Sequence, residues 1–205
     1  MSTQTTEPKK TELVIVGPCR LSYANIWKAR KNLKNEMQYD VVLLFPKENN
    51  EFCPDAKKSI KAAMDGIKAC AGLMIPAGAK YGVPFMDGDR TGKNAGHYYM
   101  TAKSSFAPAV VNPAVQPITE QDEWASGDWA NVVVNFYAGE FNGTWNIGCG
   151  LRSIQFAAHD EHFASGTGGS GIEKFTPIGE TPGTEKIRGQ DAPPNVDEYD
   201  PFADE

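Results

Sequence analysis

The chain has 205 residues, of which about 40% are apolar, so it can form one sizeable domain with tails or two small ones. Its 26 acidic and 20 basic residues give a net charge of −6, which argues against tight binding to a polyanion by charge alone. No apolar run is long enough to cross a bilayer and the first dozen residues lack the apolar segment of an export signal, so we expect no membrane contact.

The N-terminal part is expected to contain two strands. Residues 1–12 are polar, and we expect them to be disordered. Leu13–Val16 and Arg20–Tyr23 predict one strand that is interrupted at Gly17-Pro18, and Gln38–Phe45 predicts a second, strongly apolar strand. The segment between them is interpreted as a basic connection that carries aromatic residues.

One helix is predicted over Cys53–Ala71. Pro54 suits the first helical turn, Asp55 lies favourably near the positive N-terminal end, and Gly72 is a residue at which helices often end. The apolar residues at helical spacing predict a face that packs on the core, and they are Ala56, Ile60, Ala63, Met64, Ile67 and Ala71.

The second half of the body is expected to be β-structure. A long loop over 81–96 precedes a strand over His97–Lys103. Asn142-Gly143 separates two strand-like runs, Asn131–Phe141 and Thr144–Phe156, and this dipeptide favours a tight hairpin because both residues tolerate positive φ. Five strands with one inserted helix fit a small antiparallel barrel.

The C-terminal part changes composition twice. We expect the folded domain to span 13–164, followed by a Gly/Pro-rich flexible linker over 165–190. Residues 191–205 hold six acidic residues and no Lys or Arg, so the other 20 acidic residues balance the 20 basic ones. The whole net charge therefore belongs to this tail, which can mimic a nucleic-acid backbone or merely aid solubility.

The basic segment is the first candidate site. It has no acidic residue between Glu12 and Glu36, whereas five cations and two aromatic rings lie there: Arg20, Lys28, Arg30, Lys31, Lys34, Tyr23 and Trp27. Cations that follow phosphates and rings that stack on bases are what single-strand binding requires. A second group on later strands comprises Tyr98, Tyr99, Lys103, Tyr137 and Arg152, with Phe106 as a further candidate among them. The alternative is a solvated basic loop with Trp27 in the core.

The sequence gives little support for a catalytic site or a metal site. Asp87-Gly88-Asp89 with His97, and His159, Asp160 and His162, suggest a metal-dependent nuclease, but Asp-Gly-Asp is also common in turns. No phosphate-binding Gly-rich loop or nucleophile elbow is present. The four cysteines form no Cys-x-x-Cys pair, which favours free buried thiols. We therefore expect a protein without enzymatic activity, cofactor or metal.

Several segments together resemble a known family. They are RLSYANIW at 20–27, QYDVVLLFPK at 38–47, MDGD at 86–89, YYMTAKSSF at 98–106, VVVNFYA at 132–138, IGCGLRSIQ at 147–155 and the closing DEYDPFADE. In this order they are similar to the bacteriophage single-stranded DNA-binding proteins, which have an OB fold and an acidic C-terminal tail.

The resemblance implies a mainly β OB-fold barrel that coats single-stranded DNA, without sequence preference, during phage replication, recombination and repair in the cytoplasm of the infected bacterium. It also implies a tail that recruits phage replication proteins such as the polymerase and helicase-primase, and dimers formed through tail exchange. The tail residues concerned are Asp197, Glu198, Asp200, Phe202, Asp204 and Glu205. Phe202 lies three residues before the end, whereas many such tails place an aromatic residue at or next to the terminus. A structural or protein-interaction module of a phage is the main alternative.

Overall fold

The computed structural model describes residues 11–119 and 124–163, and the expected linker and acidic tail lie outside them. Its elements in chain order are β1 (Leu13–Lys31), β2 (Met37–Pro46), α1 (Ala56–Met74), β3 (Tyr81–Gly82), β4 (Met86–Asp87), α2 (Gly88–Thr91), β5 (His97–Ser104), β6 (Ala109–Val111), β7 (Trp129–Phe141) and β8 (Thr144–Ala158). Within this part of the chain, no helix combines the length and apolar character that a bilayer crossing needs.

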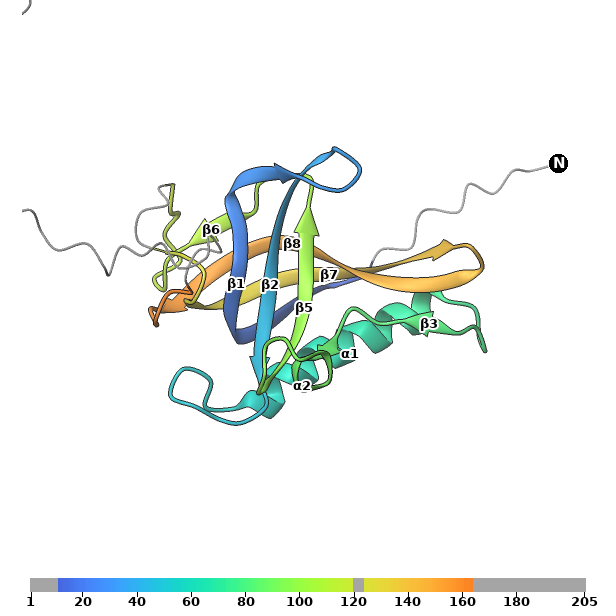
Figure 1. Cartoon of the computed structure of the whole chain (residues 1–205), viewed down its shortest axis with the longest axis horizontal. Helices are drawn as coiled ribbons and strands as arrows, with labels where there is room; N and C mark the ends of the chain where they lie inside the picture. The colour runs from blue at the N-terminus through green and yellow to red at the C-terminus, as the bar shows by residue number, and fades with distance from the viewer. Residues whose placement is uncertain (1–10, 120–123, 164–205) are drawn as a thin grey trace, which may run out of the picture. The chain divides into compact units, whose positions relative to one another are not determined.

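Five strands close into a barrel. β1 pairs with β2, β2 with β5, β5 with β8, β8 with β7, and β7 returns to β1 (Figure 1). Four of these pairings are antiparallel, and the pairing of β5 with β8 is parallel. The expected mainly β barrel with one long inserted helix is confirmed, and the parallel pairing is what allows the sheet to close.

The predicted hairpin forms as the sequence indicates. Phe141 pairs with Thr144, and Asn142 and Gly143 adopt φ values of 50° and 74°. Along β7 the side chains of Val132, Val134 and Phe136 are buried in the barrel, as their alternation predicts. The hairpin therefore presents the intervening side chains, Tyr137 among them, on the outer face.

The first strand is longer than predicted. The expected interruption at Gly17-Pro18 is present as a bulge between Val16 and Cys19, and pairing with β7 continues on both sides of it. The strand also runs past Tyr23 to Lys31, which pairs with Met37 of β2. The interpretation of this basic segment as a connection is wrong, since pairing with β2 extends it as a strand.

The helix is shifted by three residues from its predicted range. Asp55 is the N-cap and accepts a hydrogen bond of 3.0 Å from the Lys58 backbone N–H, so the helix begins after Pro54 and not before it. Gly72 does not end the helix, which continues to Met74. Ile75 is extended, as residues before proline tend to be, and Pro76 follows it.

The apolar face of α1 packs against β1 and β7. Ala56, Ala63, Ile67 and Ala71 are buried, as predicted, while Ile60 and Met64 are partly buried. Gly66 lies so close to the Phe136 ring that a Cβ atom would approach Cε2 to 2.6 Å. All four cysteines are buried free thiols, as expected.

Candidate nucleic-acid interface

Three adjoining cavities follow one side of the barrel, at the β1–β2 loop and the ends of β2 and β5. The first, of about 500 Å³, is lined by Tyr23, Asn25, Arg30, Asp40, Val42, Thr101 and Lys103. The second, of about 630 Å³, is lined by Arg30, Lys31, Asn32, Leu33, Lys34, Glu36, Gln38 and Lys103. The third, of about 590 Å³, is lined by Asn32, Glu36, Met37, Gln38, Lys103, Ser104, Ser105, Phe106, Asn135, Tyr137, Gly150, Leu151 and Arg152.

The cavities share lining residues and so form one path. Lys103 lines all three, Arg30 joins the first to the second, and Asn32 with Gln38 joins the second to the third. We call this path the interface groove. It begins at Tyr23 on β1 and ends at Tyr137 and Arg152 on the β7–β8 hairpin.

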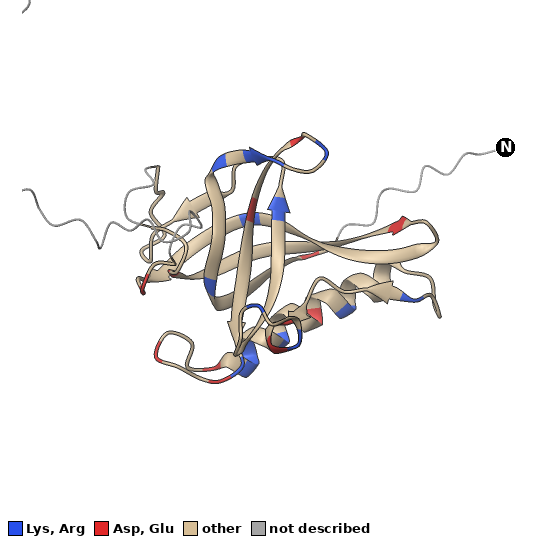
Figure 2. Cartoon of the chain, viewed as in Figure 1, with Lys and Arg blue, Asp and Glu red and all other residues tan. Residues whose placement is uncertain are grey.

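The interface groove is positively charged. Its walls hold five cations, which are Arg30, Lys31, Lys34, Lys103 and Arg152, against two carboxylates, Glu36 and Asp40. Figure 2 shows basic residues gathered at the β1–β2 loop, at the end of β5 and on β8. The excess of three positive charges suits an anionic chain.

A buried carboxylate organises the first cavity. Asp40 accepts hydrogen bonds from Arg30 Nη2 at 2.7 Å and Nε at 3.0 Å, from Asn25 Nδ2 at 2.7 Å and from Gln38 Nε2 at 2.9 Å. Burial by itself raises the pKa of Asp40, but these hydrogen bonds, with the one from Arg30 the strongest, outweigh it and the pKa lies below its ordinary value. Asp40 is thus a fixed anion that orients the guanidinium of Arg30, whose side chain stays 55% exposed.

Tyr23 is held outward by an unusual backbone. Its φ is +48°, within the irregular stretch of β1 between Ser22 and Asn25, and its side chain is among the most exposed apolar ones, at 72%. A bulky residue rarely adopts positive φ, and such strain is concentrated at functional sites. The ring is therefore available for a flat ligand group.

Two glycines of β8 leave room for side chains at the far end of the groove. A Cβ on Gly148 would lie 2.3 Å from Cζ of Tyr137, so the tyrosine ring rests directly on this glycine. Gly150 plays the same part for Asn135, whose Oδ1 accepts a 2.8 Å hydrogen bond from Arg152 Nε. These contacts fix the ring of Tyr137 and the guanidinium of Arg152 on the outer face.

A family model matches most of the sequence. Residues 12–185 match the family model described as Enterobacter phage Enc34, ssDNA-binding protein. The chain belongs to this family. As expected, this is a family of binding proteins and not of enzymes.

Solved structures show the same fold. The C-terminally truncated single-stranded DNA-binding protein of bacteriophage Enc34 has a TM-score of 0.58 and 23% identity, over 74% of this chain and 88% of that one. The structure of the Enc34 protein in complex with ssDNA gives a TM-score of 0.57 and 22% identity, over 74% and 89%. Both are single-stranded DNA-binding proteins, and at this identity they show that the present chain has their fold.

A curated relative matches a shorter stretch. "Putative protein p50" of Acyrthosiphon pisum secondary endosymbiont phage 1 is 33% identical over 82 residues, which are 40% of this chain. The match spans 44% of the length of that relative, less than half.

Seven of the twelve residues predicted from the sequence line the interface groove of this family member: Tyr23, Arg30, Lys31, Lys34, Lys103, Tyr137 and Arg152. Phe106, the further candidate of the second group, lines the third cavity and is 78% exposed. Leu33 at the β1–β2 loop is fully exposed. Leu33 is not among the predicted residues, and the signal that could have found it is an apolar residue standing alone among the charged and polar residues of this segment.

Five predicted residues line none of the three cavities: Arg20, Trp27, Lys28, Tyr98 and Tyr99. Arg20 donates hydrogen bonds to the carbonyls of Gly127 and Glu161, at 2.8 and 2.6 Å. Trp27 packs against the core and its Nε1 lies 3.4 Å from the Trp124 carbonyl oxygen. Their roles in binding stay predictions, but Arg20 and Trp27 already have contacts that hold the barrel together.

Asp87 and Asp89, which the nuclease alternative takes as metal ligands, pair with a lysine instead. Lys47 Nζ lies 2.5 Å from Asp87 Oδ1 and 2.6 Å from Asp89 Oδ2, so an ammonium group occupies the place where that alternative needs a metal ion. These two hydrogen bonds raise the pKa of Lys47 to about 12, and the one to Asp87 has the larger effect. His97 Nδ1 lies 2.9 Å from the Ala95 carbonyl oxygen.

Proposed function

We propose that the chain binds single-stranded DNA without sequence preference and acts in phage DNA replication, recombination and repair, in the cytoplasm of the infected bacterium. The observation that carries the proposal is the interface groove, in which five cations lie along one continuous path that has exposed rings at both ends. Membership in the Enc34 family supports it.

The rings favour an unpaired strand over a duplex. Tyr23, Phe106 and Tyr137 are exposed along the groove, at 72%, 78% and 48%. Stacking a base on such a ring contributes about 1–3 kcal/mol, but only a base that is free of its partner strand can reach it. The cations between the rings would contact the phosphates.

The amide side chains of the groove favour binding without sequence preference. Asn25 and Gln38 donate to Asp40, and Asn135 accepts from Arg152. Asn32 Oδ1 accepts from the backbone N–H groups of Lys34 and Glu36. Because these groups bond within the protein, they are poorly placed to read base edges, whereas stacking accepts every base.

The test is a titration of dye-labelled oligo-dT, the matched duplex and the matched RNA, followed by fluorescence anisotropy. A labelled strand is preferable to intrinsic fluorescence because none of the four tryptophans lines the groove. We expect binding to single-stranded DNA to exceed binding to duplex and to weaken with salt. Absence of binding at low salt would favour the protein-interaction module instead.

For the C-terminal tail we propose two linked roles. Its six carboxylates and Phe202 would recruit phage replication proteins such as the polymerase and helicase-primase, and in the free protein the tail would compete with DNA for the groove. Exchange of tails between two chains would give dimers.

Truncation before Asp191 tests the competition. We expect it to tighten DNA binding several-fold at low salt and to have little effect at high salt, because screening weakens both attractions. Equal affinity of the truncated and full chains at low ionic strength would exclude competition by the tail.

A further inference from the structure

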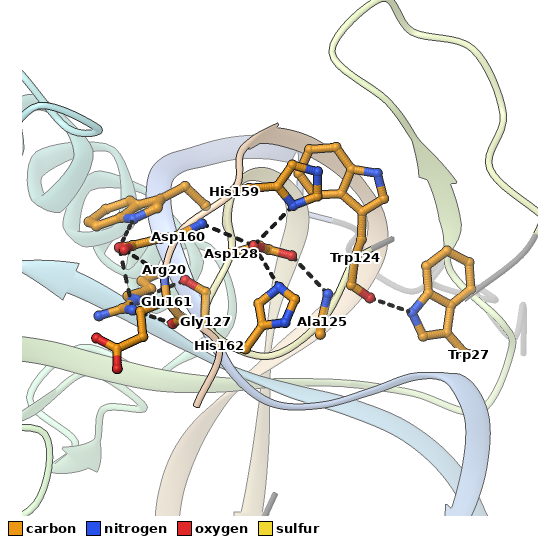
Figure 3. Close-up of polar contacts among 11 residues, drawn as sticks. Arg20, Trp27, Trp124, Ala125, Gly127, Asp128, His159, Asp160, Glu161 and His162 are labelled. Carbon is orange, nitrogen blue, oxygen red and sulfur yellow. Dashed lines mark hydrogen bonds and ion pairs between the residues drawn. The ribbon is translucent and has the colours of Figure 1, made fainter. Parts of the chain in front are cut away.

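Three side chains of types that can ligate a metal lie together outside the interface groove. His159 and His162 follow β8, and Asp128 immediately precedes β7. Asp128 Oδ1 lies 3.3 Å from His159 Nδ1 and 3.3 Å from His162 Nε2, and the three atoms lie within 4.8 Å of one another. Figure 3 shows both imidazole rings directed at the same carboxylate oxygen.

The spacing fits a shared metal ion better than direct hydrogen bonds. A charge-assisted N–H···O bond is usually about 2.7–2.9 Å long. Zinc bonds to nitrogen and oxygen are about 2.0–2.1 Å long, so two ligand atoms of a tetrahedral site lie about 3.3–3.4 Å apart. Both distances from Asp128 match that separation.

The carboxylate is held in place by its other contacts. Asp128 is fully buried, with Oδ2 accepting from the Ala125 N–H at 2.8 Å and Oδ1 from the Asp160 N–H at 3.2 Å. These contacts leave Oδ1 facing the two histidines, so its position is set before any ion arrives.

The histidines are also positioned. The His159 ring stacks on the Trp124 ring at 3.8 Å with an interplanar angle of 17°. Next to His162, the Phe163 N–H donates to the Ser126 carbonyl at 2.9 Å, which ties this segment to the loop before β7. These contacts restrict where the two imidazole rings can lie.

The third ligand differs from the one that the sequence suggested. Asp160, which lies between the histidines in the chain, accepts from Trp129 Nε1 at 2.8 Å and pairs with Arg20 at 3.4 Å. Its carboxylate therefore faces Trp129 and Arg20, and Asp128 takes its place beside the histidines.

We propose that Asp128, His159 and His162 bind one Zn²⁺ ion per chain. Two imidazoles and a carboxylate are ligands that Zn²⁺ prefers, and the histidines are half exposed, which leaves a fourth position for water. The bound ion would link the residues that follow β8 to the loop before β7. That loop supports β1, since Ser126 Oγ accepts from the Ala24 N–H at 2.9 Å.

The test is calorimetric titration of ZnCl₂ into the full chain after removal of metal with a chelator. We expect one equivalent to bind and to raise the melting temperature. His162→Ala and His159→Ala should weaken binding at least about tenfold, the effect that loss of even an outer-shell partner can have. The matched control is His97→Ala, the third histidine of the chain, which should bind as the parent does.

Zinc binding by the acidic tail would persist in these variants, so a second measurement is needed to identify the ligands. Imidazole ¹⁵N spectra should show Zn²⁺ shifting Nδ1 of His159 and Nε2 of His162 and leaving His97 unchanged. Equal zinc affinity of the parent and the His159→Ala/His162→Ala double variant, or no shift of these two nitrogens, overturns the proposal.

Discussion

Replacement of Lys103 by glutamine is the sharpest test of the interface groove. Lys103 lines all three cavities and lies exposed at the end of β5, opposite Asp40 of β2. Glutamine retains most of the side-chain length and removes the charge, so the barrel should be unaffected while the groove loses its central cation.

The magnitude follows from the five cations of the groove. If each neutralises one phosphate, the logarithm of the binding constant falls by about 0.7 per log unit of salt for each, or about 3.5 in all. Between 50 and 200 mM salt the parent should then lose about 130-fold in affinity, and Lys103→Gln about 50-fold. The change in slope, and not only in affinity, reports a lost phosphate contact.

The assay is the anisotropy titration of labelled oligo-dT at four or more salt concentrations. Lys57→Gln is the matched control, because Lys57 is exposed on α1 and lines none of the three cavities. An unchanged slope in Lys103→Gln, or the same change in both variants, would refute the assignment of the groove.

Three further substitutions test single features of the site. Tyr23→Ala should weaken binding to oligo-dT by about 1–3 kcal/mol without lowering the melting temperature, since the ring is exposed; a loss of stability with unchanged affinity would contradict this. Gly148→Ala should weaken binding as much as Tyr137→Ala, because the new Cβ displaces the Tyr137 ring, and the double variant should be no weaker than either. Asp40→Asn should cost about 1–3 kcal/mol in urea unfolding at pH 7, since the Arg30 guanidinium loses its anionic partner and one of the two oxygens that accept from it. Because the pKa of Asp40 is lowered on folding, its contribution is complete above the unfolded pKa of about 3.9 and is lost as the pH falls below it, so parent and variant should converge at low pH.

Local patterns in the sequence determined several elements correctly. Asn142-Gly143 predicts the hairpin because the two residues must adopt positive φ within two positions. The alternation along β7 predicts which side chains enter the barrel, and the helical spacing predicts the buried face of α1. These signals act over a few residues, so sequence alone can show them. The segregation of negative charge into residues 191–205 is also plain from the sequence, and the role of that tail stays a prediction.

Pairing between distant strands decided the rest. β1 extends to Lys31 because β2 supplies its hydrogen-bond partners, and β5 meets β8 only when the barrel closes. The groove joins Tyr23 to Arg152, and the proposed zinc site joins Asp128 to His162; neither neighbourhood exists before the strands pair. Local preference cannot choose among distant partners, because their attraction depends on a geometry that only the closed barrel imposes.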